Sequence, residues 1–159
     1  MNTTYQRKSQ GFTIIEVVLV LAIAGLILLM VFIALPALQR GQRDTQRRND
    51  VGRMMSQVNS YQTNSRGAVP NGETLEDPFL TSYMKWTSEE DSEFADPKTG
   101  VGYAVTYGTG TPTEAGQISF SAGAICGDGG SIVTDGAGER NVAAAVFLEG
   151  SGIYCADNR

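Results

Sequence analysis

The hydrophobic positions first mark out one long apolar segment near the amino terminus. Residues 17–38 are 22 consecutive residues without a charged or strongly polar side chain. At about 1.5 Å per residue a helix of this length spans roughly 33 Å, which is enough to cross a hydrocarbon core of about 30 Å. A core helix of a soluble protein is rarely apolar on all sides over this length. The pattern therefore predicts a membrane-spanning helix.

The apolar positions beyond this segment recur at spacings of three and four: Val51, Met54, Met55, Val58 and Tyr61. This spacing gives a helix one apolar face, while the other faces are polar. We therefore expect the membrane helix to continue to about Asn64 and to pack this face against the rest of the chain.

The carboxy-terminal region has the short alternating pattern of strands. Residues 65–98 are interrupted by prolines and predict irregular structure with one short helix around Phe79–Trp86. Four strand-like runs follow, at 101–107, 118–124, 142–148 and 153–155. Turns between them favour an antiparallel meander with one face on the helix. The predicted fold class is α+β, with a long amino-terminal helix packed on a small antiparallel sheet.

Composition argues against an enzyme. The chain has no histidine, which removes the commonest general base and the usual zinc and haem ligands. Its serines and acids show no spacing of a nucleophile and a base. Asp128, Asp135 and Glu139 lie among glycines, but their spacing does not match a calcium-binding loop. We expect no catalytic residues, no cofactor and no metal.

Charge is distributed unevenly. Residues 40–66 contain six arginines and two aspartates, whereas residues 67–159 contain four basic and fourteen acidic side chains. The arginines of interest are Arg40, Arg43, Arg47, Arg48 and Arg53. They form either a solvated helix face or a basic face that contacts the acidic regions of neighbouring copies. Nucleic acid is a third, weaker partner, because no aromatic side chains accompany the arginines and the acidic region would repel phosphate.

One acid, Glu16, borders the apolar segment. A secretory leader has no acid at this place, and an acid in a membrane is costly unless it is paired. Cleavage after Gly11 would create an α-amino group on Phe12, four residues before Glu16. The two charges could then neutralise each other within one chain or between neighbours.

The run GFTIIE at residues 11–16, after a short leader with Arg7 and Lys8 and before the apolar segment, resembles the amino-terminal signature of type IV pilins and pseudopilins. The resemblance implies that a prepilin peptidase cleaves after Gly11 and that Phe12 becomes N-methylated. It also implies that Glu16 pairs with the terminal amine of an adjacent subunit during assembly. Gly25 and Pro36 are implied to loosen the helix, although Pro36 lies three residues later than the usual proline.

The same resemblance implies how the chain is organised. Residues 1–11 are the leader peptide, and residues 12–38 form a transmembrane and filament-core helix. Residues 39–64 are its amphipathic continuation, and residues 65–159 form a globular β head. We expect one pass through the inner membrane before assembly and an extracellular filament afterwards. A count of arginines on the two sides of the apolar segment opposes this orientation.

Cys126 and Cys155 flank a glycine-rich stretch. Two cysteines form one disulfide or stay reduced, and closing this loop would contribute roughly 3–4 kcal/mol in the chain-entropy description. The pair resembles the disulfide-bounded region near the carboxy terminus of many pilins, which implies a disulfide here. A reduced structural pair is the alternative.

These features together lead us to expect a structural pilus subunit for adhesion, twitching motility or DNA uptake. The implied partners are further copies in a helical filament, minor pilins, the prepilin peptidase, an assembly platform and its ATPase. A pseudopilin of a type II secretion or competence apparatus is the first alternative. A single-pass membrane-anchored binding module is the second.

Overall fold

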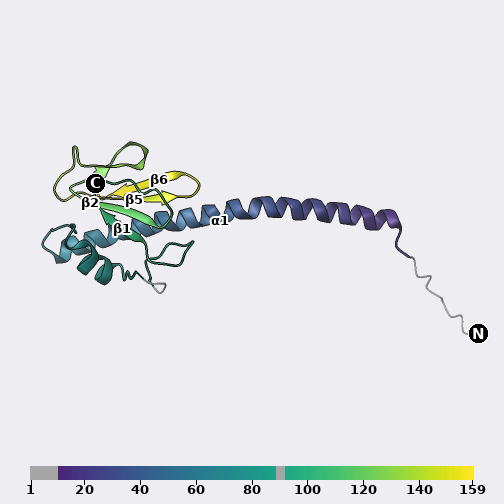
Figure 1. The fold of residues 1–159 in the computed structure, drawn as a ribbon, viewed down its shortest axis with the longest axis horizontal. Coiled ribbons are helices and arrows are strands. Elements are labelled where there is room, and N and C mark those ends of the chain that lie inside the picture. The colour runs from purple at the N-terminus through teal and green to yellow at the C-terminus, as the bar shows by residue number, and fades with distance from the viewer. Residues whose placement is uncertain (1–10, 89–91) are drawn as a thin grey trace, which may run out of the picture. The chain divides into compact units, whose positions relative to one another are not determined.

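A computed structural model describes residues 11–88 and 92–159. Its longest element is helix α1, Ile14–Asn64, with 51 residues (Figure 1). The chain divides into two compact units between Gln39 and Arg40. Because α1 ends at Asn64, the predicted continuation of the membrane helix to this residue is confirmed. The leader residues Arg7 and Lys8 lie outside the described residues.

The first unit contributes the apolar part of α1. By length and composition this helix is able to cross a membrane. All described residues of this unit are exposed to solvent in the isolated chain. Helix α1 is continuous through Gly25 and Pro36, and their helix-loosening role stays a prediction.

The second unit contains a four-stranded sheet with the order β1-β2-β5-β6 (Figure 1). The strands are β1 Ala104–Tyr107, β2 Gln117–Ala122, β5 Val142–Leu148 and β6 Gly152–Asp157. Strand β5 pairs antiparallel with both β2 and β6, but β1 pairs parallel with β2. The predicted meander is therefore wrong for β1. The connection over residues 108–116 brings the chain back to the start of β1, so that β2 runs in the same direction.

Between β2 and β5 the chain forms a small second sheet. Strand β3, Ile125–Cys126, pairs antiparallel with β4, Ile132–Val133. A single 3₁₀ turn, η2 Asp128–Gly130, joins them. The sequence pattern gave no sign of these strands because each has only two residues.

Strand β5 is buried on both faces. One face, with Val142 and Val146, packs with the apolar side chains of α1. Ala143 and Ala145 on the opposite face pack with the small sheet instead. We expected the sheet to cover the helix with one face only; the small alanine side chains let a second layer approach the other face closely.

The short helix η1, Leu75–Tyr83, begins before Pro78 rather than after it, and Trp86 lies beyond its end. Asp77, directly before the proline, has an extended backbone with φ −132° and ψ 123°, as expected for a residue in this position. The predicted helix around Phe79–Trp86 is thus present but shifted towards the amino terminus. Phe79 and Leu80 anchor it in the core.

Candidate processing and assembly site

The predicted cleavage position lies just outside the start of α1. Gly11, Phe12 and Thr13 precede the helix and are exposed. The backbone N–H of Glu16 donates to the Thr13 hydroxyl at 3.3 Å, and the N–H of Val17 donates to the Thr13 carbonyl at 3.3 Å. Thr13 therefore caps the helix and separates it from the peptide bond that a peptidase would cut.

Thr13 and Glu16 have the spacing of a capping box, which is a sequence signal for this helix start beyond the cleavage motif. A carboxylate in the first turn also interacts favourably with the positive end of the helix dipole. Glu16 thus stabilises the start of α1, in addition to its predicted role in assembly.

The Glu16 side chain has no hydrogen bond or ion pair within residues 11–88 and 92–159. It is exposed, and no basic residue lies between it and Arg40. Cleavage at the predicted position would add an amino group at Phe12, four residues before Glu16.

One of the five arginines predicted to form a basic face lies inside the head instead. Arg47 is fully buried and contacts three carboxylates of its own chain. Its guanidinium donates to Asp96 at 2.7 and 3.3 Å, to Asp44 at 3.0 Å and to Glu149 at 2.9 Å. Its assignment to an inter-subunit face is therefore wrong, since its charge is neutralised inside the head.

Asp44 connects α1 to the turn between β5 and β6. Its carboxylate accepts the backbone N–H of Glu149 at 2.9 Å and of Gly150 at 2.8 Å. A Cβ placed on Gly150 would lie 3.2 Å from the Asp44 carboxylate. The turn therefore approaches the helix closely because Gly150 lacks a side chain.

Asp96 holds a second loop against the same arginine. Besides contacting Arg47, its carboxylate accepts the backbone N–H groups of Lys98 at 3.0 Å and Thr99 at 3.3 Å. The turn closes with the N–H of Gly100 donating to the Asp96 carbonyl at 2.8 Å. One buried arginine thus joins the helix, this turn and the β5–β6 turn.

This cluster shifts the acid–base behaviour of its members. Hydrogen bonds from Arg43 and then Arg47 lower the pKa of Glu149 to about 2. Burial by itself would lower the pKa of Arg47, but the hydrogen bonds that its guanidinium donates to Asp96 and Glu149 outweigh this effect and raise that pKa. The arginines and Glu149 are therefore all charged at neutral pH.

Three of the remaining arginines are also engaged by their own head. Arg43 forms an ion pair with Glu149 at 2.7 Å. Arg48 donates to the Ser151 hydroxyl at 2.9 Å and lies 5.5 Å from the centre of the Tyr154 ring. Arg53 donates to the Met84 carbonyl at 3.2 Å. Arg40 is exposed and has no such contact in the described part of the chain. An inter-subunit role for these four residues stays a prediction.

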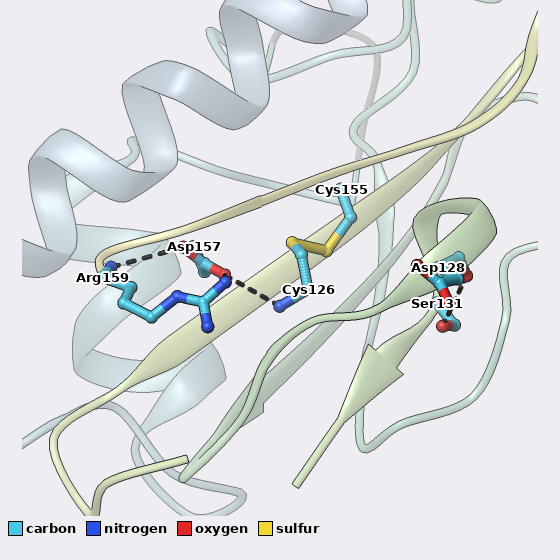
Figure 2. The surroundings of a disulfide bond; sticks show 6 residues. All are labelled: Cys126, Asp128, Ser131, Cys155, Asp157 and Arg159. Carbon is cyan, nitrogen blue, oxygen red and sulfur yellow. Dashed lines mark hydrogen bonds and ion pairs between the residues drawn. A yellow bond between two sulfur atoms is a disulfide. The ribbon is translucent and has the colours of Figure 1, made fainter. Parts of the chain in front are cut away.

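Cys126 and Cys155 form a disulfide that joins β3 to β6 (Figure 2). The predicted pairing is confirmed, and the reduced alternative is wrong. Asp157 reinforces this link, because its carboxylate accepts the Cys126 N–H at 2.8 Å (Figure 2). The disulfide therefore fixes the small second layer over the alanine face of β5.

The structure does not bring the acids of the glycine-rich loop together. No group of three or more metal-ligating side chains occurs in residues 11–88 and 92–159. The Asp128 carbonyl instead accepts the Ser131 hydroxyl at 2.8 Å (Figure 2). The loop geometry is thus explained by local hydrogen bonds.

Residues 6–32 match the protein family described as the prokaryotic N-terminal methylation motif. The match covers the predicted cleavage position, Phe12, Glu16 and the first part of the apolar helix. No curated protein and no solved structure matches the chain. The leader is therefore the class III prepilin type that is typical of type IV pilins and pseudopilins.

Proposed function

We propose that this type IV pilin-like protein is a prepilin that is cleaved after Gly11, N-methylated at Phe12 and polymerised into a surface filament. The observation that supports this best is the methylation motif on a helix whose apolar side chains before Arg40 are all exposed in the isolated chain. Such a surface needs lipid or other protein to cover it.

The mechanism is physical rather than catalytic. In the inner membrane, lipid covers the apolar part of α1. In a filament, the same segments of neighbouring copies cover one another, so extraction exchanges one apolar environment for another at little cost in hydrophobic free energy. An assembly platform and its ATPase would drive this transfer after the prepilin peptidase has removed the leader.

Glu16 gives this assembly its register. When the leader is removed, the amino group of Phe12 becomes the counter-charge that the described chain lacks. Pairing between the Glu16 carboxylate and the amine of a neighbour neutralises two charges in an apolar environment. Because a misplaced subunit would leave both charges unpaired, the pair selects one axial position.

A pseudopilin of a secretion or DNA-uptake apparatus would use the same leader and the same helix. The two functions differ in where the processed chain is found. A pilus subunit reaches the cell surface in long filaments, whereas a pseudopilin stays with the membrane apparatus. An anchored binding module would keep its leader.

Mass spectrometry of the amino terminus, on sheared surface material and on membranes, tests the proposal. We expect a chain that begins at methylated Phe12 in the sheared fraction. The same terminus in membranes alone would favour the pseudopilin, and a chain that begins at Met1 would contradict both. Gly11→Ser is a matched control, because a Cβ at Gly11 meets no atom within 4 Å and only processing should change.

A further inference from the structure

One aromatic side chain of the head is exposed without an evident structural reason. Tyr107 ends the edge strand β1 and is 45% exposed. Every other large hydrophobic side chain with comparable exposure among the described residues lies between Phe12 and Leu38. Gly72 lies against the ring, since a Cβ there would be 3.4 Å from Tyr107 Cδ1. The ring is thus held in place, although it remains half uncovered.

Tyr107 lines a pocket of about 150 Å³ together with Trp86, Leu75, Val105 and Glu76. The indole N–H of Trp86 donates to the Tyr103 carbonyl at 2.8 Å, which fixes the ring. Leu75 is buried, whereas Glu76 is exposed. The pocket therefore combines two positioned aromatic rings with a carboxylate that is accessible to solvent.

These groups fit a cation. The faces of tryptophan and tyrosine rings attract ammonium and guanidinium groups, and a carboxylate adds a hydrogen-bonding counter-charge. Among the described residues, no basic side chain lines the pocket. Its volume is well below the roughly 300–1,000 Å³ of small-molecule sites. One basic side chain matches this size better than a larger ligand does.

We propose that this aromatic pocket binds the side chain of Arg40 from a second copy of the chain in the filament. The inference rests on the proposed function. Arg43, Arg47 and Arg53 contact acids or carbonyls of their own head, and Arg48 contacts Ser151 and Tyr154. Arg40 is left without such a contact in the described part of the chain.

The position of Arg40 also suits this contact. It follows the apolar segment directly, at the first residue of the second unit. In a filament whose core is formed by the apolar segments, this residue lies where the heads of neighbouring copies begin. Its positive charge complements a head that contains four basic and fourteen acidic side chains beyond residue 66.

Crosslinking in assembled filaments tests the contact. The full chain with R40C and E76C is sheared from cells and treated with a short bismaleimide, because an arginine contact separates two backbones by more than a disulfide spans. We expect a ladder of covalent oligomers. K98C with E76C is the matched control, since Lys98 is another exposed cation of the head. A ladder from the control alone, or from neither pair, would overturn the proposal.

Charge reversal provides a second test that does not depend on crosslinking. Arg40→Glu and Glu76→Arg should each reduce sheared filament protein by about tenfold, because each places like charges in the contact. The double variant should restore it. Suppose instead that the double variant is cleaved before Phe12 and forms its disulfide, yet gives no more sheared filament protein than the single variants. That result would overturn this contact while leaving the proposed function intact. A wild-type chain that is processed but never found in sheared filaments would overturn both.

Discussion

The two units of this chain differ in how far their side chains are buried and paired within the chain itself. In residues 11–39 every side chain is exposed, and the one acid has no partner among the described residues. In the described part of residues 40–159, no buried side-chain nitrogen or oxygen lacks a hydrogen bond, although a whole arginine is buried. The first part leaves a long apolar surface uncovered, whereas the second satisfies its buried polar groups with its own residues.

The uneven charge distribution of the chain must be interpreted with this difference in mind. A basic helix and an acidic head suggest attraction between copies, but much of that attraction is used within one chain. Arg47 alone contacts Asp44, Asp96 and Glu149. Arg40, next to the apolar segment, has no such contact among the described residues.

The largest effect on the self-contained part should come from Arg47→Ala. Removing the guanidinium leaves three carboxylates close together without their shared partner, which should destabilise the head by about 3–5 kcal/mol. The only tryptophan, Trp86, lies in the head, so its fluorescence during urea unfolding in detergent reports this change. Arg48→Ala is the control, with a loss of about 1 kcal/mol or less. Equal losses for the two variants would contradict the central role of Arg47.

Removing the disulfide should have the next largest effect. Cys126→Ser with Cys155→Ser should lower the free energy of unfolding by roughly 3–4 kcal/mol. Hydrogen exchange should rise first in residues 123–141, which cover Ala143 and Ala145. If the amides of β5 exchange as slowly in the variant as in the wild type and the free energy of unfolding is unchanged, the disulfide does not stabilise the second layer.

Low pH should reduce the stability of the head by protonating Glu149. Its pKa is about 2 in the folded head, below the ordinary value of 4.5. The stability it contributes is therefore complete above about pH 4.5 and is lost as the pH falls towards 2. Burial raises the pKa of Asp50, which acts in the opposite direction. Urea unfolding at several pH values should show a smaller loss between pH 4.5 and 2 in Glu149→Gln; an unchanged slope would refute the assignment.

The smallest effect should come from the cap of the exposed part. Thr13→Ala removes the hydroxyl that accepts the Glu16 N–H and should weaken the start of α1 by about 1 kcal/mol. Faster hydrogen exchange at residues 14–17 of the unprocessed chain in detergent would show this, with an unchanged head as the internal control. Slower or equal exchange would mean that the detergent holds the helix start.

The apolar segment, the helix to Asn64 and strand β5 could be predicted because each depends on a local pattern. The ends of strand β5 match the predicted run at 142–148. The parallel pairing of β1 could not be predicted, because it depends on the path of the glycine-containing connection. The two-residue strands β3 and β4 are too short to give a pattern.

The same distinction holds for the candidate site. Gly11, Phe12 and Glu16 are adjacent in the sequence and form a motif. The Arg47 cluster joins residues that are 49 and 102 positions apart, and only the spacing of Asp44 and Arg47 indicates it locally. A close pair of opposite charges on a helix is usually a surface feature, so burial could not be inferred before the tertiary contacts were known.

We expect residues 11–39 to act between molecules, whereas the stability of the head does not depend on these residues. Glu16→Ala tests it most directly, with sheared filaments, the processed amino terminus and the Trp86 unfolding curve measured on one variant. We predict loss of filaments, a chain still cleaved before Phe12 and an unchanged unfolding curve. Normal filaments from this variant, or a destabilised head, would contradict the account.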